Sequence, residues 1–149
     1  MKAPFERFIL VFLLAFVSLG AIYGGGSMLL SPDGSLLGMD VSWLEKSPFS
    51  SFLIPGLILF FFLGFVPLIT IVGLLTRKPV RLVSTLNMFP GTHWSWSYSL
   101  YISIMIMIWI SVQQLMTDYY PFQPIIALTG TAILIILMLP KVQRYYQQL

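Results

Sequence analysis

The polar side chains best suited to bind a ligand lie along one face of an apolar stretch in the second half of the chain. At 100° per residue, the hydroxyls of Ser99 and Ser103 and the amides of Gln113 and Gln114 fall within about 60° of one line. Asp118 follows Gln114 by one helical turn. Hydroxyls, amides and a carboxylate supply the donors and acceptors that a polar ligand needs. This is the best candidate ligand site in the chain, although hydrogen bonding between helices is the favoured interpretation of these side chains.

The two amides carry a sharper expectation. A primary amide has two donors and two acceptor lone pairs, and burying it without partners costs roughly 1–3 kcal/mol. We expect at least one of Gln113 and Gln114 to be buried against another helix. Its predicted partners are Thr129, Thr131, the carbonyl freed ahead of Pro55, or water that enters beneath the loop between the first two stretches.

Most other reactive arrangements are excluded by residue type. The chain has no cysteine and a single histidine, so neither a thiolate site nor a multi-histidine metal site can form. Asp33 and Asp40 fall short of a cation cage. Ser-His-Asp sets, HExxH helices and phosphate loops do not occur. We expect no metal and no cofactor, and an enzyme built on Gln, Ser and Tyr is the least favoured hypothesis.

The elements that position these residues follow from the composition. Of the 149 residues, 58% are hydrophobic and only 9% are charged, against roughly 25% charged in an average soluble domain. So few charges cannot cover a soluble protein of this size, and lipid is the expected solvent. The net charge of +3 is divided along the chain rather than gathered in one patch, so no nucleic acid is expected as a partner.

Four apolar stretches are long enough to serve as membrane helices, each of which needs about 20 residues. They cover about residues 8–25, 52–75, 97–116 and 123–140. Lys2 and Arg7 ahead of the first stretch are also typical of a signal peptide, but we expect a retained helix. The prediction is an all-α fold over residues 1–149: a single transmembrane four-helix bundle with a structured extracytoplasmic loop between the first two helices.

The basic residues predict how the chain is threaded, because cytoplasmic loops carry an excess of Lys and Arg. Seven of the eight lie on the side that holds both termini: Lys2, Arg7, Arg77, Lys78, Arg81, Lys141 and Arg144. Only Lys46 lies on the other side. We predict that both termini are cytoplasmic. Arg77, Lys78 and Arg81 could also bind anionic headgroups, but three charges fall short of the usual cluster, so topology marking is the favoured interpretation.

Small residues predict where the helices approach one another, since helices in lipid associate through close packing. The expected packing positions are Gly56 and Gly64 in the second stretch and Ala127, Gly130 and Thr131 in the fourth. Pro55 and Pro67 each remove a backbone donor, which predicts kinks in the second stretch. Broken helices also line transport sites, so a transport role for the kinks remains as the alternative to packing.

The two longer loops contain local turn signals. The run SPDG at residues 31–34 is typical of a β-turn, and Ser42 with Glu45 matches a capping box that predicts a short helical turn. His93 directly precedes the third stretch, with Thr92 as the expected helix cap. A proton relay, a haem ligand or a pH sensor are possible roles for His93. An ordinary interfacial residue is the favoured interpretation.

The turn run SPDGS, followed by SPF and then FLIPG at the start of the second stretch, resembles a family of small uncharacterised bacterial four-span integral membrane proteins. The resemblance extends to the tryptophan-rich start of the third stretch, its QQ end and the LP-K-x-x-R-Y-Y end of the fourth. It implies the bacterial cytoplasmic (inner) membrane. It supplies no catalytic residues.

Two functions fit these observations. The first is a non-catalytic accessory or assembly subunit that interacts with a membrane-protein partner or with further copies of itself. The absence of charge inside the four stretches favours it, because ion-coupled carriers usually keep such a charge. The alternative is a binder or transporter of a neutral or lipidic ligand, which would enter through an outer-leaflet polar mouth at Gln113, Gln114 and Asp118.

Overall fold

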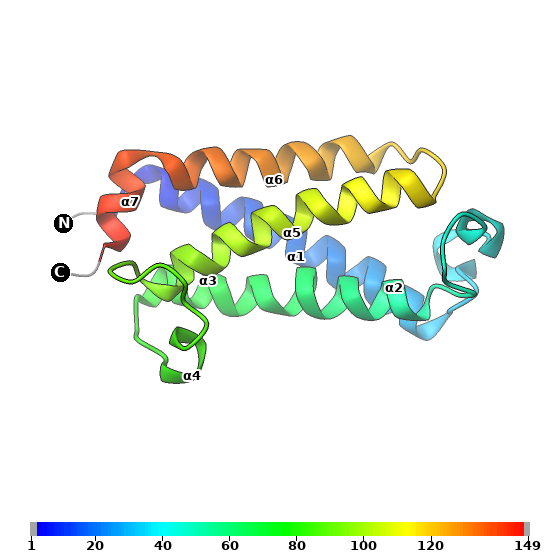
Figure 1. Ribbon diagram of the computed structural model, residues 1–149, viewed down its shortest axis with the longest axis horizontal. Coiled ribbons are helices and arrows are strands. Elements are labelled where there is room, and N and C mark those ends of the chain that lie inside the picture. The colour runs from blue at the N-terminus through cyan, green and yellow to red at the C-terminus, as the bar shows by residue number, and fades with distance from the viewer. Residues whose placement is uncertain (1–2, 148–149) are drawn as a thin grey trace.

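The computed structural model describes residues 3–147, and within them the chain folds as helices joined by loops (Figure 1). In chain order the elements are α1 (Phe5–Leu30), the 3₁₀ turns η1 (Ser35–Leu37) and η2 (Val41–Leu44), α2 (Leu53–Ile58), the π-helical η3 (Leu59–Phe65), α3 (Val66–Thr76), α4 (Arg81–Ser84), α5 (Trp94–Met116), α6 (Phe122–Met138) and α7 (Pro140–Tyr146). No strand forms in this range, and Thr92 and Gln147 make an isolated antiparallel bridge. The prediction of an all-α protein is confirmed. Lys2 lies outside the described residues.

Three helical runs are long and apolar enough to cross a membrane: α1, the run from α2 through α3, and α5. A fourth is reached if α6 and α7 count as one bent span. The two helices meet at an angle of 72°, and the break falls at Leu139, directly before Pro140. A residue before proline is pushed out of the helical region, and Leu139 has an extended backbone.

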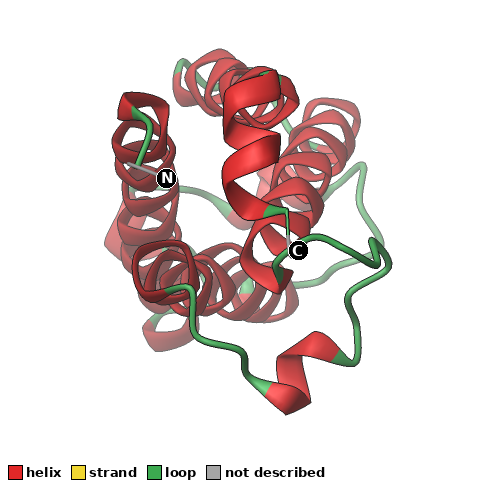
Figure 2. Cartoon of the chain, turned by 90° about the vertical axis from the view of Figure 1, so that its left-hand side faces the viewer, coloured by secondary structure: helices red, strands yellow, loops and turns green. Residues whose placement is uncertain are grey.

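The helices form an elongated molecule with the long loop 31–52 at one end and both termini at the other (Figures 1 and 2). We call these the loop end and the terminal end. In Figure 1 α6 and the α2–α3 run lie along the long axis, while α1 and α5 cross obliquely between them. The first helix therefore packs on α6 near the terminal end and on α2 near the loop end. The third long helix, α5, packs on α3 at the terminal end and on α6 along its length.

Helix α1 continues further than its sequence suggests, to Leu30, through three consecutive glycines. Gly25 lies directly against the second run: a Cβ there would be 2.7 Å from the backbone nitrogen of Phe60 and 2.9 Å from the carbonyl oxygen of Gly56. The glycines cost helix propensity, but they let the two backbones touch. After Leu30, Ser31 begins the turn that the SPDG run predicts, which is closed by a hydrogen bond from the Gly34 N–H to the Ser31 carbonyl.

The second run is wound as a π-helix ahead of Pro67, whereas Pro55 lies in the first turn of α2. Pro67 has no N–H to donate, and the residues before it adopt the π-helical segment η3, in which the Val66 N–H reaches back to the Phe61 carbonyl. The Gly64 carbonyl, one turn before Pro67, accepts a 2.7 Å hydrogen bond from the Ser18 hydroxyl of α1. The π-helical turn keeps the Val66 N–H paired ahead of Pro67, and the Ser18 hydrogen bond joins α1 to the second run.

The core is one apolar cluster along the centre of the molecule. Its fully buried members come from α1, the α2–α3 run, α5, α6 and α7: Leu10, Leu14, Leu63, Leu74, Ile106, Ile133, Leu137, Val142 and Tyr146. A second, smaller cluster lies at the loop end and consists of Met28, Leu44 and Phe52. Loop 31–52 is therefore packed onto the helix ends rather than extended away from them.

Candidate functional site

The serines of the predicted polar face are buried inside the protein. The Ser99 hydroxyl donates to the Ser95 carbonyl of its own helix at 2.8 Å. The Ser103 hydroxyl crosses to α6 and donates to the Gly130 carbonyl at 3.1 Å. Both side chains are fully excluded from solvent. Each hydroxyl is therefore already engaged with backbone, Ser99 within α5 and Ser103 between α5 and α6.

The two amides at the end of this face, Gln113 and Gln114, are less buried than expected. Gln113 is half-buried and Gln114 is exposed, so the prediction that one of them is buried is wrong. Neither amide makes a side-chain hydrogen bond to any described residue, and Thr129 and Thr131 instead donate to carbonyls of their own helix. Asp118 is exposed as well, 4.0 Å from Lys46 of the long loop.

The difference has a geometric cause. The two glutamines flank the line through Ser99 and Ser103, about 40° to one side and 60° to the other. Near the terminal end, neighbouring helices cover the whole of this angular range on α5, because α5 lies between α3 and α6. Toward the loop end α5 diverges from the α2–α3 run and keeps only α6 as its main neighbour (Figure 1). A single neighbouring helix covers a narrower stripe of the α5 surface, so side chains at the edges of that stripe, such as Gln113 and Gln114, are not fully buried.

The buried amide at the loop end is Gln123, at the start of α6. It is only 2% exposed. Its Oε1 accepts the Tyr120 N–H at 3.4 Å, and its Nε2 donates to the Thr117 hydroxyl at 3.5 Å. The amide thus closes the short connection between α5 and α6. The sequence does contain a hint that Gln123 is buried, because it lies between Pro121 and Pro124 in a very short connection. A loop this short needs a side chain to form hydrogen bonds with its backbone groups.

Loop 31–52 covers this connection. Trp43 packs against Tyr120, with ring centroids 6.4 Å apart, and Lys46 faces Asp118. The helical turn around Trp43 is the 3₁₀ turn η2, and its cap is Asp40, whose carboxylate accepts the Ser42 N–H at 2.8 Å. The capping box from Ser42 to Glu45 does not form, because the turn begins two residues earlier than that pattern requires.

Asp33 and Asp40 of this loop have structural roles. The Ser31 and Ser35 hydroxyls and the Ser35 N–H donate to Asp33, which holds the pKa of that carboxyl below its ordinary value. Hydrogen bonds from Ser42 lower the pKa of Asp40 in the same way. Across residues 3–147 no group of three or more His, Asp or Glu side chains lies close enough to hold a metal ion.

The positions expected to mediate helix packing lie between helices. A Cβ on Gly56 would meet the Met28 side chain at 2.7 Å, and one on Gly64 would meet Ile22 at 2.8 Å. On α6, Gly130 faces Ile106 of α5, 2.8 Å from the position of a Cβ. The other two predicted positions, Ala127 and Thr131, are partly buried on α6.

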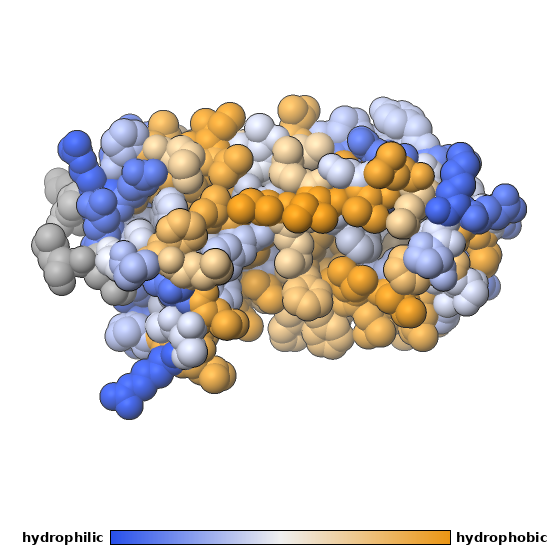
Figure 3. Space-filling model, viewed as in Figure 1, coloured by the Kyte–Doolittle hydropathy of each residue, from blue (hydrophilic) through white to orange (hydrophobic). Residues whose placement is uncertain are grey.

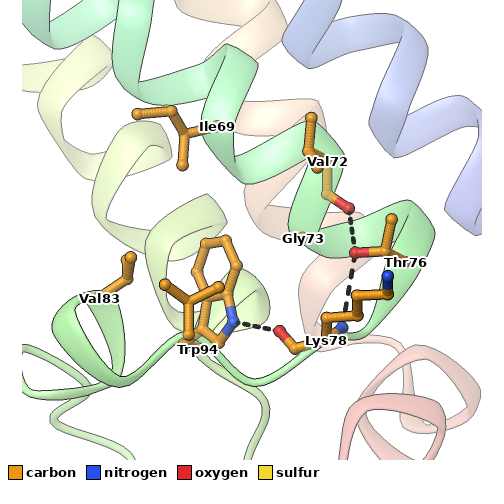
Figure 4. A pocket seen from close by; sticks show the side chains of 8 residues that line it. Ile69, Val72, Gly73, Thr76, Lys78, Val83 and Trp94 are labelled. Atoms are coloured by element: carbon orange, nitrogen blue, oxygen red, sulfur yellow. Dashed lines mark hydrogen bonds between the residues drawn. The ribbon is translucent and has the colours of Figure 1, made fainter.

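Aromatic and polar side chains gather at the terminal end around the start of α5. His93, rather than Thr92, caps this helix: its Nδ1 accepts the Ser95 N–H at 3.3 Å. Its Nε2 lies 3.3 Å from the Lys78 carbonyl, which also accepts a 3.0 Å bond from the Trp94 indole (Figure 4). The neutral ring with its proton on Nε2 satisfies both neighbours. Burial lowers the pKa of His93, and the nearby positive charge of Arg77 lowers it further, against the opposing effect of the bond to Lys78.

Hydrogen bonds also hold the last helix, α7, at the terminal end beside His93. The Tyr146 hydroxyl donates to the Leu74 carbonyl of α3 at 3.0 Å, and the Tyr146 carbonyl accepts the His93 N–H at 2.7 Å. Arg7 of α1 donates to the Tyr145 hydroxyl at 2.8 Å. The guanidinium of Arg77 lies 4.6 Å above the Tyr145 ring. Residues far apart in sequence are thus bound into one cluster.

No family model, no curated protein and no solved structure matches this chain.

Proposed function

We propose that the chain is a transmembrane four-helix bundle of the bacterial cytoplasmic membrane, with both termini cytoplasmic and loop 31–52 as a structured cap outside. The surface supports this proposal. Apolar side chains gather around the middle of the molecule and hydrophilic ones at its two ends (Figure 3). Phe12 of α1 is 68% exposed and Leu128 of α6 is 70% exposed, which water would oppose and lipid accepts. The orientation rests on the excess of basic residues at the terminal end.

Labelling of single cysteines tests the orientation, because the natural chain has no cysteine. Ser35→Cys lies in the exposed part of loop 31–52, and Ser84→Cys lies in α4 at the terminal end. In intact spheroplasts a membrane-impermeant maleimide should label the first variant only, and after lysis it should label both. Labelling of Ser84→Cys alone in intact spheroplasts would reverse the proposed orientation.

The proposed role is that of a non-catalytic accessory or assembly subunit that binds other membrane components. One observation carries this proposal: serine and threonine side chains buried within the spans donate to backbone carbonyls. Ser18 and Ser103 do so between helices, and Ser99, Thr70 and Thr129 do so within their own. The two bonds between helices stabilise the packing, and all five hydroxyls are engaged with backbone, whereas catalysis or ion transport needs polar groups free to meet a substrate.

Photo-crosslinking tests for a partner. A photoreactive amino acid at Phe62 of η3 and another at Leu128 of α6 would probe two different lipid-facing sides, since both side chains are at least half exposed. In native membranes an assembly subunit should crosslink to the same membrane protein from one of these positions and to lipid from the other. Lipid adducts alone from both positions, together with a monomer that purifies without partners in mild detergent, would overturn the proposal.

The alternative role, binding or transport of a neutral or lipidic ligand through the mouth at the loop end, receives less support. Gln113, Gln114 and Asp118 are at most half-buried there, and Trp43 and Tyr120 lie together over the neighbouring connection. A ligand would meet an open surface rather than an enclosed site. Mass spectrometry of small molecules extracted from the purified protein, compared between the natural chain and Gln113→Leu/Gln114→Leu, distinguishes the two roles.

A further inference from the structure

An apolar groove runs between α3 and the segment that contains α4, at the terminal end of the molecule (Figure 4). It has two adjoining parts, of about 390 Å³ and about 450 Å³, which share Ile69 of α3 and Val83 of α4. Each part falls within the size range of small-molecule sites, about 300–1,000 Å³. Trp94 forms one wall, and its indole is held in place by the bond to the Lys78 carbonyl. The groove is therefore a built feature of the fold.

One end of the groove is continuous with the surface that would face lipid. Ile69 and Val72 line it and are also about half exposed, on the outer side of a helix long and apolar enough to span the membrane. A chain of methylene groups can therefore pass from the bilayer into the groove without crossing a polar barrier. Apolar walls of this kind favour an acyl chain over any polar ligand.

The other end of the groove has two basic residues at or next to it. Lys78 lines the groove just beyond the end of α3. Arg81 is not part of the lining, but it begins α4 directly before Leu82 and Val83, which are. Among residues 3–147 the ion pairs join Lys46 to Asp118 and Lys141 to Glu6, so Lys78 and Arg81 face no side-chain carboxylate. These two cations complement a phosphate group.

The segment around α4 has the character of an interfacial element. Leu82 is 85% exposed and Met88 is 79% exposed, on a stretch that also carries exposed basic residues. Apolar side chains that face outward beside basic ones suit a segment at the boundary between acyl chains and headgroups. This places the groove at the depth where a phospholipid has both its phosphate and the start of its acyl chains.

We propose that this groove binds one anionic phospholipid, with an acyl chain against Ile69, Val83 and Trp94 and the phosphate against Lys78 and Arg81. The proposal rests on insertion of the chain in a membrane, but on no protein partner. Surface attraction of lipids takes four or more cations. A single lipid needs fewer here, because burial of its acyl chain adds to the attraction of its phosphate.

Native mass spectrometry of the purified full chain in mild detergent tests the proposal. Phosphatidylglycerol and phosphatidylcholine with identical acyl chains are titrated separately. The natural chain should retain one phosphatidylglycerol at concentrations where it retains no phosphatidylcholine. The double variant Lys78→Gln/Arg81→Gln should weaken retention of phosphatidylglycerol about thirtyfold, at roughly one kcal/mol for each cation near the headgroup. The control Lys46→Gln/Arg144→Gln removes the same charge from exposed residues outside the groove and should retain phosphatidylglycerol like the natural chain.

A second variant tests the acyl chain. Val83→Trp fills the region that the two parts of the groove share, and it should abolish retention of phosphatidylglycerol while the helix content measured by circular dichroism stays unchanged. Equal retention by the Lys78→Gln/Arg81→Gln variant and its control would overturn the proposal. So would equal retention of the two lipids by the natural chain, since the site would then not select an anionic headgroup. Should Val83→Trp fail to fold, the exposed pair Lys78 and Arg81 still decides the matter.

Discussion

The hydroxyl of Ser18 in α1 donates a hydrogen bond of 2.7 Å to the carbonyl of Gly64 in η3, one turn before Pro67. The two residues are 46 positions apart in the chain, and both are buried. The same kind of contact recurs between Ser103 and Gly130 on the other helix pair. In each case the missing side chain of glycine lets the helices approach closely enough for a serine to reach backbone. Glycine and serine thus act as one packing unit.

Ser18→Ala should destabilise the protein because it removes the hydrogen bond that joins α1 to η3. The expected loss is about 0.6 kcal/mol and at most about 1.7 kcal/mol, the range measured for hydrogen bonds between membrane helices. Unfolding in mixed micelles of increasing SDS content measures it. Ser111→Ala is the matched control: Ser111 is exposed and donates only to the Met107 carbonyl of its own helix, so its loss should leave the midpoint unchanged. Equal midpoints for both variants would show that the contact with Gly64 contributes nothing.

Two glycines of α1 should respond oppositely to alanine. Gly25→Ala places a Cβ 2.7 Å from the backbone nitrogen of Phe60, where no flexible side chain can move aside, so we expect a loss of about 1–3 kcal/mol. A Cβ at Gly20 would have no atom within 4 Å. Gly20→Ala should therefore stabilise the protein by up to about 1 kcal/mol, because alanine has the higher helix propensity. Both free energies of unfolding are measured in the same SDS titration. A neutral Gly25→Ala would mean that α1 and the second run are not in backbone contact.

Replacement by leucine should lower stability at the buried glutamine, Gln123, and leave it nearly unchanged at the exposed glutamine, Gln114. Gln123→Leu leaves the Tyr120 N–H without its acceptor and removes the bond to the Thr117 hydroxyl, which keeps its own bond to the Gln113 carbonyl. We expect a loss of about 1–3 kcal/mol. Gln114→Leu removes an exposed amide with no partner among the described residues and should change stability by no more than about 0.5 kcal/mol. Thermal unfolding in detergent, followed by circular dichroism, compares the two. The reverse order would mean that the polar centre of the loop end is Gln114 after all.

Stability should fall at mildly acidic pH because of His93. Its pKa is lowered in the folded protein, chiefly by burial, so the unfolded chain takes up a proton at a higher pH than the folded one does. The contribution is fully present above the ordinary histidine pKa of about 6.5 and is lost as the pH falls from there toward the lower folded value. Protonation of Nδ1 also removes the acceptor for the Ser95 N–H. The midpoint of SDS unfolding, measured between pH 8 and pH 5, should decline for the natural chain.

His93→Asn is the matched variant for this pH dependence. Asparagine is a good helix cap and does not titrate in this range, so the decline between pH 7 and pH 5 should disappear while the helix keeps its start. An unchanged decline in His93→Asn would show that His93 is not its source. Asp33 and Asp40 have lowered pKa values, so their contributions are lost only at more acidic pH.

The amino-acid sequence by itself determined the class of fold. Long apolar stretches, scarce charges and turn residues between the stretches predict helices in lipid, because each of these signals acts over a few neighbouring residues. The packing positions Gly56, Gly64 and Gly130 could be identified in the same way, because a small residue is what allows two helix backbones to approach closely. The break before Pro140 is likewise local, although the bend of 72° is not.

The tertiary structure alone decided which side chains are covered. Helical periodicity places Gln113 and Gln114 beside the serine face of α5, but their exposure depends on α5 diverging from the α2–α3 run near the loop end. The burial of Gln123 and the groove beside Trp94 likewise depend on helices that are distant in sequence. A periodic pattern gives the direction of a side chain around its own helix axis. Whether a neighbour lies in that direction is set by how the helices cross.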